Sequence, residues 1–164
     1  MIMVWIVLYL PQQGVHKSSG FTAMTNYKIK TETGYINLSP VGFRLAARDY
    51  FKCYLDFKKP GRFSVVPYFL CCRAIELALK AIHLETKKQA DVKLKYSHNL
   101  LTSYSELPKD KQILSKEELE LLKQVNQLYS KKDFEYFSVV DAATGFQRYP
   151  DLDALAQLAQ KLTD

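Results

Sequence analysis

The stretch of residues 66–86 constrains the fold of this chain most, because it predicts a helix that is apolar around almost its whole circumference. At about 100° per residue, one face carries Leu70, Ala74, Leu77, Ala81 and Leu84, and most of the opposite side carries Ile75, Ala78, Leu79 and Ile82. A helix of this kind is stable only when other elements cover it on several sides. The sequence therefore predicts an all-α domain with this helix at its centre.

The rest of the same helix is a narrow polar stripe, which consists of Arg73, Glu76, Lys80, His83 and Lys87. Glu76 and Lys80 are four residues apart and can form an ion pair along the helix. The first four residues of the polar stripe could line a groove that binds a phosphate or a nucleotide. Alternatively, the stripe is a solvated or interface face, as charge runs at helical spacing usually are.

Together with residues 66–86, other segments with helical periodicity predict a bundle of four or five helices. The predicted helices cover residues 39–57, 97–107, 115–129 and 151–162, with a charged connector at 87–95 and a loop at 141–150. Ser39 is a candidate cap for the first of them. Ser115 and Glu118 have the spacing of a capping box. Either Asp151 or Asp153 can cap the last helix.

Residues 27–38 alternate apolar and polar side chains around a possible turn at Glu32-Thr33-Gly34. This pattern predicts a short β-hairpin ahead of the helices. A lone hairpin is only marginally stable in water, so we expect it to lie on the helices.

Residues 1–10, MIMVWIVLYL, form an apolar run that is too short for a transmembrane helix, which needs about 20 residues. Neither a basic region before the run nor a small-residue cleavage site after it marks a signal peptide. We therefore predict that the chain starts at Met24, that residues 1–23 are an extension outside the fold, and that residues 24–164 form one helical domain. The alternative is a targeting or membrane role for the extension. The expected location is the cytoplasm, with no membrane partner.

The formal net charge of +6 permits an acidic partner such as RNA or a nucleotide, because lysine and arginine attract phosphate, but it does not require one. The chain has three cysteines, and an odd number argues against a disulfide framework. Cys71 and Cys72 lie in an apolar run, where thiols usually act as small core side chains. No CxxC or HExxH motif and no glycine-rich phosphate loop occurs, so we expect no metal site and no cofactor.

Two segments of the chain resemble the HEPN family of small helical bundles. They are residues 75–80, Ile-Glu-Leu-Ala-Leu-Lys, and residues 98–100, His-Asn-Leu. Counting the order of the helices, the match covers residues 39–162. The resemblance implies a bundle of four or five helices that is often dimeric. Members of the family include RNA-cleaving toxins and defence proteins, and also non-catalytic modules that bind nucleotides or partner proteins.

The chain lacks one motif that catalytic members of the HEPN family carry, an arginine followed after four to six residues by a histidine late in the bundle. In those members the histidine moves the proton of the RNA 2′-OH and the cation steadies the phosphate. The histidines here are His16, His83 and His98, so the last two predicted helices contain none. Nine residues separate Arg73 from His83, which corresponds to about 15 Å along a helix axis.

Further candidate site residues lie outside the polar stripe. His98 could act as an acid–base group, although a residue there more commonly orients the start of a helix. Arg148 and Tyr149 lie in a predicted loop, where the arginine could meet a phosphate and the tyrosine could stack on a base. The alternative is that Tyr149 packs on the bundle and that Pro150 interrupts the preceding segment.

Taken with the resemblance, these features predict a non-catalytic HEPN-like module that binds RNA, a nucleotide or a partner protein, in a toxin–antitoxin or defence setting. We expect it to form a homodimer. One alternative is an enzyme, a divergent endoribonuclease that uses His83 or His98 together with Arg73 or Arg148. The other is a structural protein whose polar stripe closes a dimer.

Overall fold

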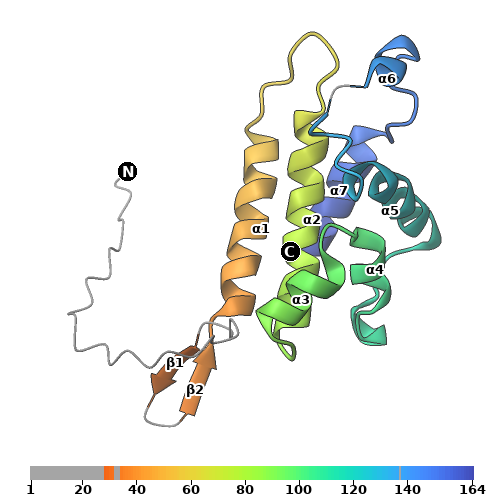
Figure 1. Ribbon diagram of the computed structural model, residues 1–164. Helices are drawn as coiled ribbons and strands as arrows, with labels where there is room; N and C mark the ends of the chain where they lie inside the picture. The colour runs from red at the N-terminus through yellow and green to blue at the C-terminus, as the bar shows by residue number, and fades with distance from the viewer. Residues whose placement is uncertain (1–27, 32–33, 137) are drawn as a thin grey trace, which may run out of the picture.

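The computed structural model describes residues 28–31, 34–136 and 138–164, and it is mainly helical (Figure 1). A two-stranded hairpin, β1 (Lys28–Thr31) and β2 (Gly34–Asn37), comes first. The α-helices that follow are α1 (Ser39–Leu55), α2 (Val66–Leu84), α3 (Gln89–Tyr96), α4 (Leu100–Ser105), α5 (Lys116–Tyr129), α6 (Val139–Ala143) and α7 (Leu152–Thr163). The predicted all-α class is therefore confirmed. The predicted extension at residues 1–23 lies outside the described residues.

Helix α2 is the centre of the bundle, as its apolar circumference predicts. Helix α1 runs antiparallel beside it, α7 crosses behind it, and α3, α4 and α5 cover the remaining side (Figure 1). Side chains on different faces of the helix, including Cys72, Ala74 and Leu84, have no exposed surface. None of the described helices combines the length and the apolarity that crossing a bilayer requires.

The main core forms where α4, α5 and α7 meet α2. It joins Ile75 and Leu79 of α2 to Leu100 of α4, Leu122 of α5 and Leu155 of α7. Cys71 and Cys72 belong to the same cluster, which confirms that they act as core side chains. Burial raises the pKa of the Cys71 thiol to about 12, so this thiol stays protonated.

Capping signals in the sequence place two of the helix starts. The capping box of α5 is present, since Ser115 Oγ accepts from the Glu118 amide and Glu118 Oε2 accepts from the Ser115 amide. Asp151 caps α7 by accepting from the Ala154 amide at 2.8 Å. The prediction that Ser39 caps α1 is wrong, because the helix already begins at Ser39 and the Asn37 side chain accepts from its amide.

Two segments predicted as connections are partly helical. Residues 89–96 form α3, where Val92 and Tyr96 lie four apart and both bury against Leu84. This tertiary contact stabilises the helix. The sequence alone does not indicate it, because most side chains of the segment are polar or charged. Helix α6 extends into the predicted loop at 141–150, and Ser138 caps it by accepting from the Asp141 amide.

The predicted hairpin is present, with Ile29 opposite Ile36 in an antiparallel pair. Its turn, residues 32–33, lies outside the described residues. The hairpin extends beyond the base of α1 instead of lying on the helices (Figure 1), and both isoleucines are exposed. The Asn37 amide group donates to the Leu84 carbonyl at 3.0 Å, which ties the end of β2 to the end of α2.

Candidate functional site: a buried carboxylate beside a cationic pocket

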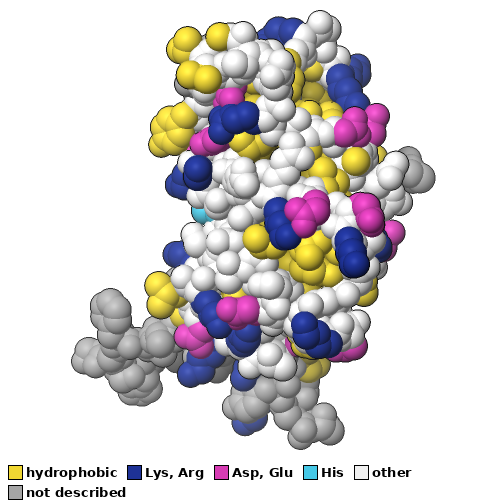
Figure 2. All heavy atoms as spheres, turned by 90° about the vertical axis from the view of Figure 1, so that its right-hand side faces the viewer, with side chains coloured by type: hydrophobic (Ala, Val, Ile, Leu, Met, Phe, Trp, Pro, Cys, Tyr) yellow, Lys and Arg dark blue, Asp and Glu magenta, His cyan; other side chains and the backbone are white. Residues whose placement is uncertain are grey.

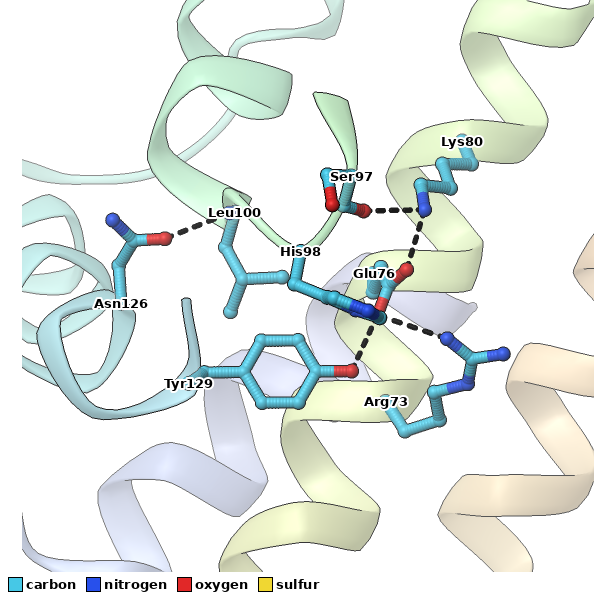
Figure 3. Close-up of polar contacts among 8 residues, drawn as sticks. All are labelled: Arg73, Glu76, Lys80, Ser97, His98, Leu100, Asn126 and Tyr129. Carbon is cyan, nitrogen blue, oxygen red and sulfur yellow. Dashed lines mark hydrogen bonds and ion pairs between the residues drawn. The ribbon is translucent and has the colours of Figure 1, made fainter. Parts of the chain in front are cut away.

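The Glu76 carboxylate is the centre of a buried polar network (Figure 3). Its side chain is only 2% exposed, and four groups contact its oxygens. Lys80 Nζ lies 2.5 Å from Oε1, while Arg73 Nη1 and His98 Nδ1 lie 3.0 Å and 3.2 Å from Oε2. The Tyr129 hydroxyl also donates to Oε2. The network therefore joins α2 to α5 and to the turn that precedes α4.

This environment keeps Glu76 ionised. Burial by itself raises the pKa of the carboxyl group, but Lys80, Tyr129 and Arg73 together outweigh that effect and bring it below its usual 4.5. Burial and the neighbouring Glu76 raise the pKa of Tyr129, so its hydroxyl remains a hydrogen-bond donor. A charge that is buried in this way needs such partners, because an unpaired carboxylate is costly away from water. The predicted Glu76–Lys80 pair is confirmed.

A strained turn fixes the opposite side of the network. Ser97 has φ 44° and ψ −115°, and the Asn99 amide donates to the Tyr96 carbonyl at 2.8 Å. These values describe a type II′ turn with Ser97 at the position that glycine favours. The turn directs the Ser97 carbonyl to Lys80 Nζ, 2.5 Å away, and places His98 beside Glu76. Backbone strain of this kind persists where the surroundings hold it, often at functional sites.

His98 is held so that one ring nitrogen is engaged and the other is not. A neutral imidazole donates its Nδ1–H to the Glu76 carboxylate, and Nε2 then carries the lone pair. No hydrogen-bond partner of Nε2 is found among the described residues. The ring lies edge-on to Tyr129, with the centroids 5.8 Å apart, and the side chain is 38% exposed. The Nε2 atom of His98 can therefore form a hydrogen bond to a bound molecule, in a direction that depends on where the ring carries its proton.

A pocket of about 340 Å³ opens over this network. It is lined by Phe43, Arg73, Glu76, Leu77, Lys80, Gln89, Val92, Lys93, Ser97 and His98. Three cationic side chains, those of Arg73, Lys80 and Lys93, share this lining with one carboxylate, and we call the space the cationic pocket. Such an excess of positive charge favours an anionic ligand.

The positive charge of the chain does not gather into one broad surface on the face that Figure 2 displays. There, lysine and arginine side chains alternate with aspartate and glutamate side chains, with apolar groups between them (Figure 2). A long nucleic-acid track would appear as a continuous basic band. The face that Figure 2 displays carries no continuous basic band of this kind.

His83 lies outside the cationic pocket, although the sequence places it on the same stripe. It is buried, with Nε2 2.8 Å from the Ser103 carbonyl and Nδ1 3.1 Å from Lys87 Nζ. Its ring stacks on Tyr96 with the centroids 4.1 Å apart. Burial, and to a smaller extent Lys87, lowers the pKa of His83 below its usual 6.5. With both nitrogens engaged, His83 serves packing.

Arg148 and Tyr149 also lie outside the cationic pocket. Arg148 forms a two-pronged ion pair with the buried Asp141, at 2.6 Å and 2.5 Å, and contacts Asp133 at 3.3 Å. Tyr149 packs in an aromatic cluster, with its ring centroid 5.0 Å from that of Phe63. The interpretation of Tyr149 as a packing residue is therefore confirmed, and Arg148 holds the loop that follows α6.

Three residues of the site are absent from the set that the sequence predicts. Tyr129 appears in the sequence only as part of the apolar face of α5, and Lys93 lies in the segment interpreted as a connector. Nothing in the sequence indicates the positive φ of Ser97. The helix predicted from residue 97 begins three residues later, at Leu100, and Asn99 caps it by accepting from the Thr102 amide.

Comparison of the chain with protein families, with characterised proteins and with solved structures finds no significant match. Within the part of the chain that the structure describes, no group of three or more histidine, cysteine, aspartate or glutamate side chains could hold a metal ion. The side chains of the site are three cations, one buried carboxylate and one partly exposed imidazole.

Proposed function

We propose that this protein is a non-catalytic HEPN-like binding module whose cationic pocket binds the phosphate group of a nucleotide or of RNA. The observation that carries the proposal is the convergence of Arg73, Lys93 and His98 on one pocket whose single carboxylate is already satisfied. Because Glu76 is neutralised by Arg73 and Lys80, it does not repel an incoming anion. Lys93 has no ion-pair partner among the described residues, so its charge is available to a ligand.

The chemistry of the lining favours phosphate over other anions. The planar guanidinium of Arg73 matches the paired oxygens of a phosphate, and a lysine adds a point charge. A volume of about 340 Å³ lies within the range of small-ligand sites, about 300–1,000 Å³. A partner protein would need a much larger surface, so we favour a phosphate-bearing ligand.

The resemblance to the HEPN family supports the same assignment. Its two segments, residues 75–80 and 98–100, are distant in the sequence and meet at the Glu76–His98 contact. The proposal includes a homodimer, as the resemblance implies, and the exposed Val41 and Leu45 on α1 offer an apolar surface for it. It also includes a role in a toxin–antitoxin or defence system in the cytoplasm, where unpaired cysteines are the rule.

Calorimetric titration with AMP and adenosine tests the proposal. AMP should bind more tightly than adenosine, and its affinity should fall as the salt concentration rises. Lys93→Gln should weaken AMP binding by about fivefold, in line with the loss of a charge-assisted hydrogen bond. The matched control is Lys116→Gln, which removes the same charge at the start of α5 and should leave the affinity unchanged. No binding, or equal effects of both variants, would contradict the proposal.

A second candidate is a divergent ribonuclease, which one observation favours. Arg73 and His98 contact the same carboxylate oxygen, whereas a wide separation would have excluded their joint action. Glu76 orients His98 as the acidic partner orients the histidine of a catalytic triad. RNA cleavage that is lost in His98→Ala and kept in His83→Gln would establish this activity and overturn the non-catalytic assignment.

A further inference from the structure

A second hollow adjoins the cationic pocket. It has a volume of about 460 Å³ and shares Phe43, Leu77 and Gln89 with the cationic pocket. Its other apolar walls are Leu38, Gly42 and Ala46. We call this hollow the apolar annex. The two spaces share a wall, but one is lined by charges and the other almost wholly by hydrocarbon.

The apolar annex follows from the spacing of small residues along α1. Leu38, Gly42 and Ala46 are four apart and therefore lie on one face of the helix. The absence of a side chain at Gly42 and the single methyl group of Ala46 leave space beside α2. A Cβ atom built at Gly42 meets no atom within 4 Å.

Phe43 forms the wall between the two spaces and is fixed from two sides. It packs on a cluster of Ala47, Leu77 and Ala78 and also on a cluster of Leu84 and Val92. A ring that is held in this way offers a rigid apolar surface at the edge of the cationic pocket. A planar group bound there loses little to reorganisation of the protein.

We propose that the two spaces hold one ligand, a nucleotide whose phosphate lies in the cationic pocket and whose base lies in the apolar annex against Phe43. This inference rests on the proposed function, and it adds a subsite for the base. Phosphate alone would leave the annex empty, and an apolar ligand alone would make no use of the Lys93 charge, which has no ion-pair partner among the described residues. A nucleotide joins an anionic group and a flat, weakly polar ring at the distance of one ribose. Stacking on an aromatic ring is a common way in which proteins hold a base.

Gly42→Leu fills the apolar annex without changing a charge. Leucine is a better helix former than glycine, and the space at Gly42 is open, so the variant should fold. The matched control is Gly61→Leu, in the loop between α1 and α2 at the other end of α1 (Figure 1), where a Cβ also meets nothing within 4 Å. Gly42→Ala adds one carbon and should have a small effect. Thermal unfolding followed by circular dichroism checks that all three variants fold.

The measurement is the dissociation constant of AMP and of ribose 5-phosphate for each full-length protein. The wild type should bind AMP about tenfold more tightly than ribose 5-phosphate, the contribution of one stacked base. Gly42→Leu should abolish this preference and leave the affinity for ribose 5-phosphate unchanged, while Gly61→Leu should change neither.

The outcomes separate the two proposals. Equal binding of AMP and ribose 5-phosphate to the wild type would overturn the base subsite and leave the phosphate site in place. The same conclusion follows if Gly42→Leu leaves AMP binding intact or weakens both ligands equally. If neither ligand binds the wild type, the proposals of a phosphate site and of a base subsite are both contradicted.

Discussion

His98 Nδ1 lies 3.2 Å from Oε2 of Glu76, and these two residues, 22 positions apart, join the turn before α4 to the centre of α2. The contact places a partly exposed imidazole over a buried carboxylate. Glu76 therefore organises the site, because Arg73, Lys80 and Tyr129 contact the same group.

Replacing Glu76 by glutamine should destabilise the fold strongly. The change leaves Lys80 buried without its counterion, and breaking a buried pair typically costs about 3 kcal/mol. The free energy of unfolding, measured by urea denaturation at neutral pH, should fall by about that amount. The control is Glu120→Gln, because Glu120 is 71% exposed in its pair with Lys123 and should lose less than about 0.5 kcal/mol. Similar losses in the two variants would show that the Glu76 network contributes no special stability.

Ser97→Gly should stabilise the protein. Glycine adopts the positive φ of Ser97 without steric strain, so the free energy of unfolding should rise by about 1 kcal/mol. Ser130→Gly is the matched control, since Ser130 has φ −66° at the end of α5 and gains nothing from glycine. A lower melting temperature for Ser97→Gly would mean that the turn is not strained.

Because His83 is buried, the free energy of unfolding should decrease in mild acid. Its pKa in the folded protein is depressed below 6.5 by burial, so below that pH the unfolded chain takes up a proton that the folded protein does not. The free energy of unfolding should therefore decrease as the pH falls from about 7.5 to about 5.5, by up to about 1.4 kcal/mol per pH unit. His83→Gln should show a shallower decrease over the same range. Identical slopes for the two proteins would contradict the assignment.

Asn126→Ala should loosen the start of α4 and with it the position of His98. The side-chain oxygen of Asn126 accepts from the Leu100 amide at 2.8 Å (Figure 3). Losing this bond leaves an amide at the helix start unsatisfied, which costs about 1–2 kcal/mol. Urea denaturation measures the loss, and Gln127→Ala, at the exposed neighbouring position, should change stability by less than about 0.5 kcal/mol. An equal effect of both variants would exclude this role.

The elements with a strong local signal were predictable from the sequence. The apolar circumference of α2 requires a central position, and the capping box of α5 depends only on residues three apart. Helix α3 was not predictable, because its charged surface hides the two side chains, Val92 and Tyr96, that bury it. That burial depends on contacts with α2, which no local pattern encodes.

The site was predictable only in part, for the same reason. Arg73, Glu76 and Lys80 of the polar stripe line one pocket, because one helix face carries them. His83, on the same stripe, does not line it, since the cationic pocket covers only part of the stripe and the His83 ring stacks on Tyr96. The placement of His98 beside Glu76 depends on the backbone of Ser97, and a sequence pattern does not specify a strained dihedral angle.

A crystal structure of the protein with AMP would show directly whether the cationic pocket binds phosphate. We expect phosphate oxygens within hydrogen-bonding distance of Arg73 and Lys93, beside His98, with the side chains of the Glu76 network in place. Phosphate density at another part of the surface, with the cationic pocket empty at a saturating AMP concentration, would contradict it.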